Sequence, residues 1–372
     1  MFLSSRYKPK SLNTIMKYFL ALLTVLILRI DVAAQATYTI SGTVKNTKGE
    51  KIQSATVFIT GTQKMTMTNA DGSFSFKNVI PGNYQVVVNM LGYNSVKQDI
   101  TLNNGPEMLN LTLADKEIAL KEVVIAVKKQ SKRNMNFFYK YFMGPSYNPD
   151  RYKILNPEII DFVDTDTALT ATTSDFLIIE NKVLGYRVKY LLKAFVQWYD
   201  KNSTYYDGDY IFEPMEGSPA QEYFWAENRK RTYYGSLMHF YRSVYTGTTR
   251  QEGFLLYKSI PDKGVFASVE RTPADVEQMV QRTDSNYVNI KLEPWVNIAY
   301  DKEKADKPDE ADDGKPKKLI FSLGNKGSLI LVVGKVDSRG SIASKKYHYR
   351  GYWASQRIAN LLPFEYKPDY SK

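Results

Sequence analysis

The sequence predicts a mainly β N-terminal domain, a small sandwich of seven strands, followed by an α+β domain with antiparallel strands. Short segments of alternating apolar and polar residues recur between residues 38 and 113. Turn sequences such as Ala70-Asp71-Gly72 and Pro81-Gly82-Asn83 separate these segments. Beyond residue 136, long alternating runs occur beside helical patterns, which favours a mixed second domain.

Each strand of the predicted sandwich has apolar residues at every second position. Alternate residues of a strand point to the same face, so we expect one face of each strand in the core and its neighbours in water. The expected core sets are Tyr38, Ile40 and Val44; Ala55, Val57 and Ile59; Phe74 and Phe76; and Tyr84, Val86, Val88 and Met90.

Five spaced elements of residues 37–115 together resemble a known domain. They are G-x-V at 42–44, A-x-V-x-I-x-G-T at 55–62, D-G-x-F-x-F at 71–76, P-G-x-Y at 81–84 and G-Y at 92–93. This pattern resembles the carboxypeptidase regulatory-like domain, a transthyretin-like (prealbumin-like) β-sandwich. The resemblance implies the fold and a scaffold role, because in metallocarboxypeptidases this domain is an accessory beside the zinc domain.

Composition argues against catalysis by a metal or a thiol. A zinc carboxypeptidase needs two histidines and a glutamate as ligands. The chain has only two histidines, His239 and His348, and neither begins an H-x-x-E motif. It has no cysteine, which excludes a thiol nucleophile, a disulfide and a lipid-bearing cysteine. No P-loop, G-x-S-x-G or dinucleotide motif occurs, so we expect no enzyme activity, no metal and no cofactor.

The N-terminus predicts export. Residues 1–36 contain a basic start, a short apolar run and an A-x-A-like end, which is typical of a signal peptide. Met16 by itself begins a complete signal, so residues 1–15 are interpreted as an over-long start. An uncleaved anchor is the alternative. We expect a periplasmic or outer-membrane-associated protein, without a membrane-spanning helix after cleavage.

Charge and location bear on the partners. The formal net charge is +11, and removing five basic residues and one acidic residue with residues 1–36 leaves +7. This mild excess is spread along the chain, so we expect no nucleic-acid partner. The expected partners are an envelope protein, a peptide or a glycan, with peripheral association at the outer membrane.

Residues 116–135 are predicted to be a linker. Residues 120–127 are similar to an L-x-E-V-V-V stretch that follows this sandwich in TonB-dependent outer-membrane receptors. The basic residues 128–133 fit a linker, and a surface-binding basic patch is the alternative.

The second domain is predicted at residues 136–372. Phe176 to Glu180 and a long strand at 186–198 form a hairpin around Asn181-Lys182. The other predicted elements are helices at 136–142, 219–244 and 272–281, strands at 286–300 and 318–336, and a disordered loop at 301–318. The elements N-P-E at 156–158, L-G-Y at 184–186 and W-A-E-N-R at 225–229 resemble an uncharacterised family of envelope proteins, over residues 137–255.

The densest polar group in the second domain is the candidate ligand or interaction site. It consists of Trp225, Glu227, Asn228, Arg229, Arg231 and His239. One reading is a ligand pocket in which Arg229 binds a carboxylate or sugar. The other is a structural helix with a weak Glu227–Arg231 pair and a packed His239.

Acidic residues offer a weaker alternative. Asp161, Asp164 and Asp166 lack the glycine and distal glutamate of a calcium loop. Asp207 and Asp209 lie in a sequence typical of a hairpin turn. We therefore expect an exported, non-catalytic scaffold or interaction protein of the cell envelope. A peptide- or glycan-binding module is the first alternative, and a hydrolase using acidic residues of the second domain is the next.

Overall fold

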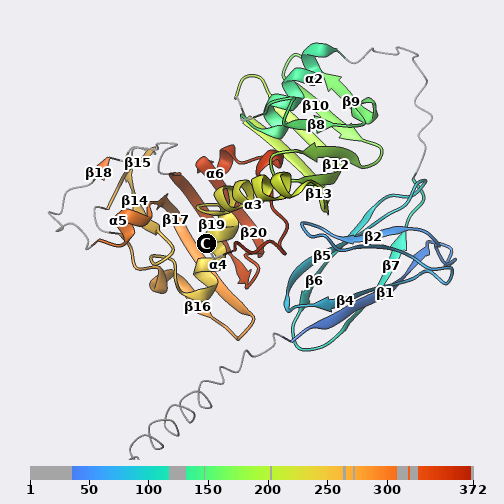
Figure 1. Cartoon of the computed structure of the whole chain (residues 1–372), viewed down its shortest axis with the longest axis horizontal. Helices are drawn as coiled ribbons and strands as arrows, with labels where there is room; N and C mark the ends of the chain where they lie inside the picture. Colours follow the sequence, from blue (N-terminus) through green and yellow to red (C-terminus); the bar gives the residue numbers. More distant parts are fainter. Residues whose placement is uncertain are drawn as a thin grey trace, which may run out of the picture. The chain divides into compact units, whose positions relative to one another are not determined.

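The structure is a computed structural model that describes residues 36–116 and 131–369, apart from residues 146, 202, 263–264, 271–272, 308–316 and 319–325. The predicted signal peptide and most of the predicted linker lie outside the described residues. Residues Thr37–Lys372 form one compact unit, which is mostly β as the sequence predicts (Figure 1). No helix among the described residues has the length and apolar character needed to cross a membrane.

Seven strands form the N-terminal sandwich, which confirms the predicted fold class. One sheet has the order β4-β1-β7 and the other the order β3-β2-β5-β6. The strands are β1 (Tyr38–Asn46), β2 (Thr56–Ile59), β3 (Met65–Met67), β4 (Ser73–Val79), β5 (Gly82–Asn89), β6 (Val96–Leu102) and β7 (Glu107–Leu113). The predicted apolar sets line the space between the sheets, with Tyr38 and Met90 at its margin.

Steric crowding explains why the G-x-V element begins with a glycine. Gly42 pairs with Leu109 where β1 and β7 run parallel. A Cβ at Gly42 would lie 2.3 Å from the Leu109 carbonyl oxygen and 2.8 Å from the Phe74 ring. Any larger residue would therefore push β1 away from its neighbours.

One part of the sandwich expectation is wrong. Phe58 and Val87 neighbour the core sets and were expected to face water, yet both are fully buried. They contact Ile211 and Phe176 of the second domain. The sandwich therefore buries apolar side chains on both faces of one sheet, as strands covered on both sides do.

We call the described residues 131–369 the second domain, although they form one compact unit with the sandwich. They include a six-stranded antiparallel sheet of order β8-β11-β12-β10-β9, in which β13 pairs with the other edge of β12. Its strands are β8 (Tyr152–Ile154), β9 (Ile160–Asp164), β10 (Ala168–Thr173), β11 (Leu177–Asn181), β12 (Tyr186–Trp198) and β13 (Ser203–Pro214). A short 3₁₀ helix, η2 (Pro157–Ile159), precedes β9. The predicted hairpin between β11 and β12 is confirmed, since the Asn181 side-chain oxygen accepts the Val183 and Leu184 amides in the turn.

The predicted turn around Asp207 is wrong, because β13 continues through it. Gly208 is needed for packing rather than for reversal. A Cβ there would lie 2.4 Å from the Tyr190 ring, which crosses the strand at this point. A glycine between two aspartates thus imitates a turn signal inside a strand.

One face of this sheet is covered by a short helical segment. Helix α2 (Lys132–Phe138) continues into the π-helical η1 (Tyr139–Met143), so the predicted helix at 136–142 is confirmed and begins earlier, inside the predicted linker. Phe138 and Phe142 stack at 4.7 Å and contact Phe195 of β12. Such aromatic pairs add about 0.5–1.5 kcal/mol each beyond their burial.

The predicted helix at 219–244 is two helices. Helix α3 (Pro219–Tyr233) begins at a capping box of Ser218 and Gln221, and α4 (Leu237–Thr246) begins at Ser236. Gly235 separates them with a φ of +76°, which a right-handed helix excludes. The apolar periodicity continues across the break, so the sequence pattern does not show that α3 and α4 are separate helices.

The C-terminal sheet has the order β18-β15-β14-β17-β19-β20, with β16 pairing with β17. Its strands are β14 (Phe254–Asp262), β15 (Val265–Val269), β16 (Val280–Arg282), β17 (Tyr287–Tyr300), β18 (Lys317–Lys318), β19 (Ser328–Asp337) and β20 (Ile342–Gly351). The predicted strands at 286–300 and 318–336 are confirmed by β17 and by β19 with its later start. Helix α4 contributes Phe240, Tyr241 and Val244 to the core on one face. Short helices α6 (Tyr352–Ser355) and η5 (Ile358–Asn360) follow.

Two predictions in this region need correction. The helix expected at 272–281 is only one 3₁₀ turn, η3 (Val276–Met279), followed by β16. The Asp275 side chain accepts the Glu277 amide as the N-cap of this turn, so the helical segment begins at Val276 and not at 272. The first part of the loop expected at 301–318 contains a short helix, α5 (Lys302–Ala305), whose Ala305 is buried against Leu255, Tyr257 and Val269. Residues 308–316 of that loop lie outside the described residues, so the loop there stays a prediction.

Candidate functional site

Trp225 fixes helix α3 to the turn between β11 and β12. Its side chain is only 3% exposed, and its indole N–H donates to the Lys182 carbonyl at 2.9 Å. The ring occupies the space above Gly185, where a Cβ would come within 2.3 Å of it. Gly185 also has a φ of +66°, so the L-G-Y element serves both the turn and the indole.

Arg229 lies one helical turn after Trp225 and uses the same turn. Its Nε donates to the Leu184 carbonyl at 2.6 Å and its Nη2 to the Gly185 carbonyl at 3.2 Å. Its guanidinium also stacks on the Tyr186 ring at 4.2 Å. These donors are therefore directed at backbone carbonyls, as a structural role requires.

The other polar residues of α3 do not converge with Arg229. Arg231 is exposed and Glu227 half-buried, and the expected ion pair between them is missing from those formed in the described part of the chain. The side-chain nitrogen of Asn228 is buried without a hydrogen-bond partner. The contacts that fix α3 therefore come from Trp225 and Arg229.

His239 lies in a separate aromatic cluster at the break between α3 and α4. Its Nδ1 accepts the Gly235 amide at 3.1 Å, and its Nε2 lies 3.1 Å from a Glu252 carboxylate oxygen. The rings of Tyr233 and Phe254 enclose the imidazole. Burial lowers its pKa, and the neighbouring Glu252 opposes this shift. The structure therefore divides the six candidate residues between two places.

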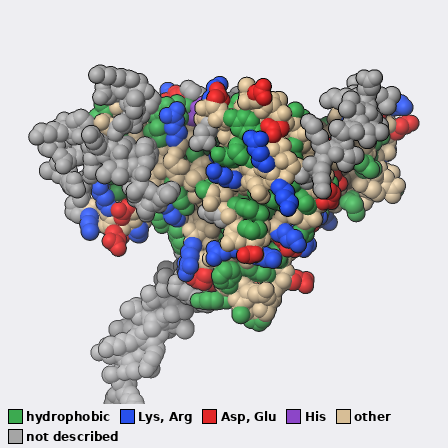
Figure 2. All heavy atoms as spheres, turned by 90° about the horizontal axis from the view of Figure 1, so that it is seen from above, with side chains coloured by type: hydrophobic (Ala, Val, Ile, Leu, Met, Phe, Trp, Pro, Cys, Tyr) green, Lys and Arg blue, Asp and Glu red, His purple; other side chains and the backbone are tan. Residues whose placement is uncertain are grey.

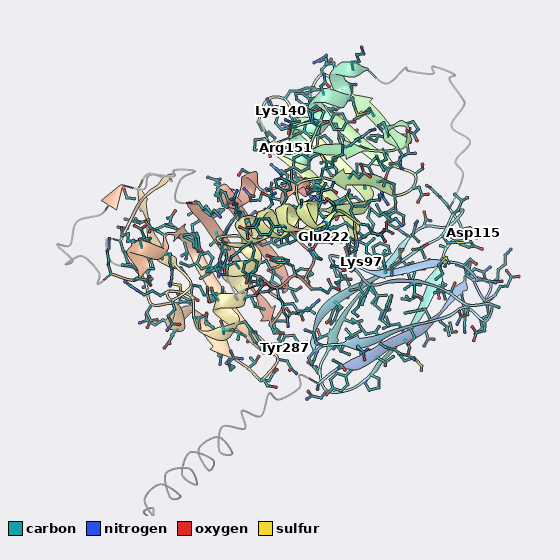
Figure 3. All side chains as sticks on the ribbon, viewed as in Figure 1. Lys97, Asp115, Lys140, Arg151, Glu222 and Tyr287 are labelled. Carbon is teal, nitrogen blue, oxygen red and sulfur yellow. The ribbon has the colours of Figure 1, made fainter. Side chains whose placement is uncertain are left out.

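Two of the acidic candidates, Asp164 and Asp209, are engaged within the fold, whereas Asp161, Asp166 and Asp207 are exposed. Asp164 accepts the Tyr199 hydroxyl at 2.7 Å. Asp209 is fully buried, and its two carboxylate oxygens lie 2.5 Å from the Nζ of Lys97, which is labelled in Figure 3, and 2.7 Å from Lys193 Nζ. Within the described ranges, no cluster of three acidic or histidine side chains could hold a metal ion.

Lys193 reaches Asp209 because of a β-bulge in β12. The register between β12 and β13 shifts between Leu192 and Ala194, and Lys193 is the extra residue. A bulge redirects the side chain of its extra residue. Lys97 comes from β6 of the sandwich, so this triad joins the sandwich to the second domain.

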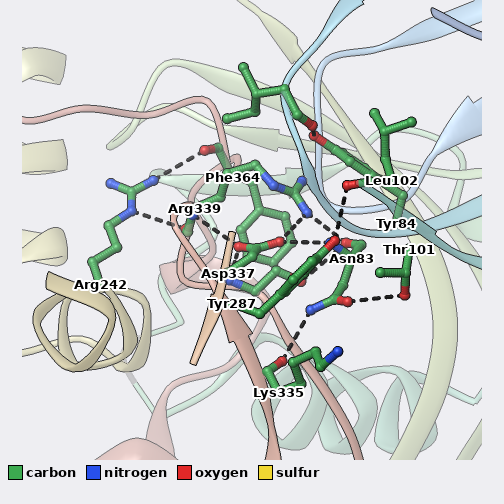
Figure 4. A network of polar contacts seen from close by, with 12 residues as sticks. Asn83, Tyr84, Thr101, Leu102, Arg242, Tyr287, Lys335, Asp337, Arg339 and Phe364 are labelled. Atoms are coloured by element: carbon green, nitrogen blue, oxygen red, sulfur yellow. Dashed lines mark hydrogen bonds and ion pairs between the residues drawn. The ribbon is translucent and has the colours of Figure 1, made fainter. Parts of the chain in front are cut away.

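A second charged network joins the same two parts, and the sequence analysis did not find it (Figure 4). Asp337 is fully buried, and one of its oxygens accepts the Asn83 amide at 2.9 Å and the Arg339 Nη2 at 2.7 Å. The same Nη2 donates to the Asn83 carbonyl at 2.6 Å. The Arg339 guanidinium lies 3.8 Å from the centre of the Tyr84 ring.

Neighbouring contacts extend this network. The Tyr287 hydroxyl donates to the Leu102 carbonyl at 3.0 Å. Arg242 of α4 donates to the carbonyls of Arg339, Phe364 and Tyr366. Burial raises the pKa of Tyr84 to about 12, with the Arg339 charge acting in the opposite direction. We call Asn83, Tyr84, Asp337 and Arg339 the inter-domain network.

The free edge of β13 is closed by the sandwich. The Gly61 amide donates to the Tyr210 carbonyl at 2.8 Å, and the Phe212 amide donates to the Thr62 carbonyl at 2.9 Å. The Phe364 amide donates to the Gly61 carbonyl at 2.9 Å. The G-T and P-G-x-Y elements of the sandwich therefore both contact the second domain.

One signal in the sequence could have indicated this interface. Strand β2 carries Val57, Phe58 and Ile59 in succession, and β5 carries Val86, Val87 and Val88. A continuous apolar run is typical of a strand buried on both faces. The charged network has no comparable signal, because Asn83 and Asp337 are 254 residues apart.

Surface charge does not indicate one kind of binding partner. In the face shown in Figure 2, Lys and Arg side chains are dispersed among acidic and apolar ones. Lys132 and Arg133, the described end of the predicted basic patch, are exposed on α2.

Comparison with known proteins identifies the N-terminal part. Residues 40–125 match the family model of the CarboxypepD_reg-like domain, which confirms the resemblance. The chain is also 33% identical over 122 residues to the TonB-dependent receptor SusC of Bacteroides thetaiotaomicron. This match covers 33% of the chain and 11% of that receptor, so the chain spans about a tenth of the length of the curated relative it matches.

Solved structures resemble a small part of the chain. A 3-chlorocatechol 1,2-dioxygenase from Rhodococcus opacus has a TM-score of 0.20 at 11% identity, over 23% of this chain and 62% of its own. A cohesin–X-dockerin complex from Acetivibrio cellulolyticus has a TM-score of 0.18 at 22% identity, over 20% of this chain and 56% of its own. TM-scores this low support no argument about this chain, so its fold is described by its own strand topology.

Proposed function

We propose that this chain is an exported protein of the cell envelope that acts without catalysis, as a scaffold or interaction partner through residues 136–372. Its match to a CarboxypepD_reg-like domain and its similarity to an outer-membrane receptor support the envelope context. The proposed location is the periplasm or association with the outer membrane. The predicted signal peptide at residues 1–36 supplies the route.

The inter-domain network is the observation that carries the scaffold role. Asp337 and Arg339 are 0% and 7% exposed, and each contacts Asn83 of the sandwich. Separating the two domains would break the hydrogen bonds of Asp337 and Arg339 to Asn83 and expose their ion pair to water. The sandwich is therefore a fixed support for the second domain, and a scaffold requires such a support.

The lack of catalysis is proposed from how the candidate groups are used. Trp225 and Arg229 donate to backbone carbonyls, and the Asp209 carboxylate lies between two lysines. A general base or acid needs a carboxyl group directed at a substrate. These residues are directed at the fold instead.

Affinity purification tests this proposal. The full chain with a C-terminal tag is expressed in its own host, purified from envelope fractions after cross-linking, and its partners are identified by mass spectrometry. We expect the chain in the envelope fraction with a reproducible protein partner. A cytoplasmic location, or turnover of a peptide or glycan panel that is lost on substituting Asp164, would contradict the proposal.

A peptide- or glycan-binding module is the second candidate function. A cavity of about 580 Å³ beside α4, β14 and β16 is within the size range of ligand sites.

A further inference from the structure

The loop between β6 and β7 contains an asparagine–glycine pair whose backbone the fold does not hold. Residues 103–106 connect Leu102, the last residue of β6, to Glu107, the first residue of β7. In the described part of the chain, these four residues make no backbone hydrogen bond. Asn104 is exposed, and a Cβ added at Gly105 would meet no atom within 4 Å. The Gly105 amide nitrogen is therefore free to approach a neighbouring group.

A free amide can attack the side chain of the asparagine that precedes it. The Gly105 nitrogen bonds to the Cγ of Asn104, and the side-chain nitrogen leaves as ammonia with the amide proton. The product is a five-membered succinimide ring. Water then opens the ring at either of its two carbonyl groups, which gives aspartate or isoaspartate at position 104. A glycine favours the ring closure because no Cβ stands beside the attacking nitrogen.

The aspartate–glycine pairs of the described chain lack these conditions, although an aspartate can form the same ring. In the pair Asp71-Gly72, the glycine amide donates to the Asn69 carbonyl at 2.9 Å. The pair Asp207-Gly208 lies inside strand β13, where a Cβ on the glycine would come within 2.4 Å of the Tyr190 ring. A hydrogen bond or a packed strand keeps the amide away from the preceding side chain.

Other asparagines that precede small residues are also held by the fold. The Asn69 amide donates to the Ser73 carbonyl at 2.9 Å, and the Asn94 amide donates to the Ala114 carbonyl at 2.8 Å. Alanine follows the first of these asparagines and serine follows the second, so each attacking nitrogen would carry a Cβ beside it. Exposure, a free amide and a following glycine therefore coincide at Asn104.

Asn104 lies where the sandwich meets the second domain. Its side-chain oxygen accepts the Asn286 side-chain amide at 3.4 Å. The Tyr287 hydroxyl donates to the carbonyl of Leu102, which immediately precedes the loop (Figure 4). On the facing turn, the Asp284 carboxylate accepts the amides of Asn286 and Tyr287. A carboxylate at position 104 would add a negative charge beside this turn, and isoaspartate would also lengthen the main chain by a methylene group.

We propose that Asn104 is a site of spontaneous deamidation, located at the contact between the sandwich and the second domain. The reaction needs no enzyme, and water is its co-reactant. It turns a neutral amide into a carboxylate, so the formal net charge of residues 37–372 falls from +7 to +6. This inference goes beyond the proposed function, and neither depends on the other.

Incubation of the purified full chain at physiological temperature tests the site. Samples from pH 8.5 and pH 6.5 are digested and analysed by mass spectrometry, and isoaspartate is detected with an isoaspartyl methyltransferase. The peptide that contains Asn104 should gain about 1 Da. The gain should be at least about tenfold faster at pH 8.5, because the deprotonated amide is the attacking group. On cation exchange, the aspartate product should elute with the variant Asn104→Asp.

Two controls separate the effect of the loop from that of the sequence pair. Gly105→Ala should slow the gain of mass at least about tenfold, and the open space there leaves the fold intact. A synthetic peptide of residues 101–107 gives the rate without the fold, and the native chain should react within about tenfold of it. Stronger protection of Asn104 in the native chain would overturn the proposal. Equal rates for the parent chain and Gly105→Ala, or equal modification at Asn69 and Asn94, would overturn it too.

Discussion

Substituting Arg339 by alanine tests how the sandwich is held to the second domain. The change removes the bonds from Arg339 Nη2 to Asp337 at 2.7 Å and to the Asn83 carbonyl at 2.6 Å. It also leaves Asp337 as a buried carboxylate without a positive partner. Breaking one side of a buried pair costs about 3–5 kcal/mol.

The expected loss lies at the lower end, about 3 kcal/mol, because Asp337 keeps other donors. The amides of Asn83, Arg339 and Ser341 all donate to its carboxylate. These contacts stabilise the negative charge when the guanidinium is removed.

Urea denaturation followed by tryptophan fluorescence measures the free energy of unfolding. The matched control is Arg151→Ala, since this arginine is exposed and its loss should cost less than about 0.5 kcal/mol (Figure 3). Asp337→Asn and the double variant complete a cycle, and the coupling should be at least about 1 kcal/mol. A loss below about 1 kcal/mol, or additive single effects, would refute the assigned network.

Two other substitutions test the elements around α3 and α4. Gly185→Ala should destabilise the chain by at least about 2 kcal/mol, because Gly185 has a φ of +66° and the added Cβ would lie 2.3 Å from Trp225. The control Gly105→Ala has open space around it and should cost far less. Equal urea midpoints for the two variants would contradict this prediction. The pKa of buried His239 is lowered, so the unfolded chain takes up its proton first, and stability should fall as the pH drops below about 6.5, by at most about 1.4 kcal/mol per pH unit. His239→Gln should flatten that profile between pH 7 and 5, and an unchanged slope would assign the effect to other groups.

Local patterns predicted the elements whose partners are close in sequence. The hairpin of β11 and β12 and the seven sandwich strands follow from alternation and turn residues, which act over a few positions. Predictions failed where a contact with residues distant in sequence decided whether a segment forms a strand, a turn or a helix end. Gly208 lies in a strand because Tyr190 packs over it, and Gly235 ends α3 within a continuous apolar pattern.

The candidate site shows the same difference between local patterns, which were recognised, and distant contacts, which were not. Trp225 and Arg229 were recognised as a polar and aromatic group, but their partners at Lys182 to Gly185 lie more than 40 residues away. The ion pair that the i,i+4 spacing of Glu227 and Arg231 predicted is missing from those formed in the described residues. The cavity beside β16 had no signal, since a helix was expected where the chain forms η3 and β16.

By itself, the sequence determined the sandwich, the absence of cysteine and the hairpin of β11 and β12, because alternation, turns and composition depend on neighbouring residues alone. Tertiary structure alone decided that Phe58 and Val87 are buried and that Asn83 meets Asp337 and Arg339. Those contacts join residues up to 256 positions apart. Whether such groups are exposed or paired depends on which surfaces meet, which no local pattern records.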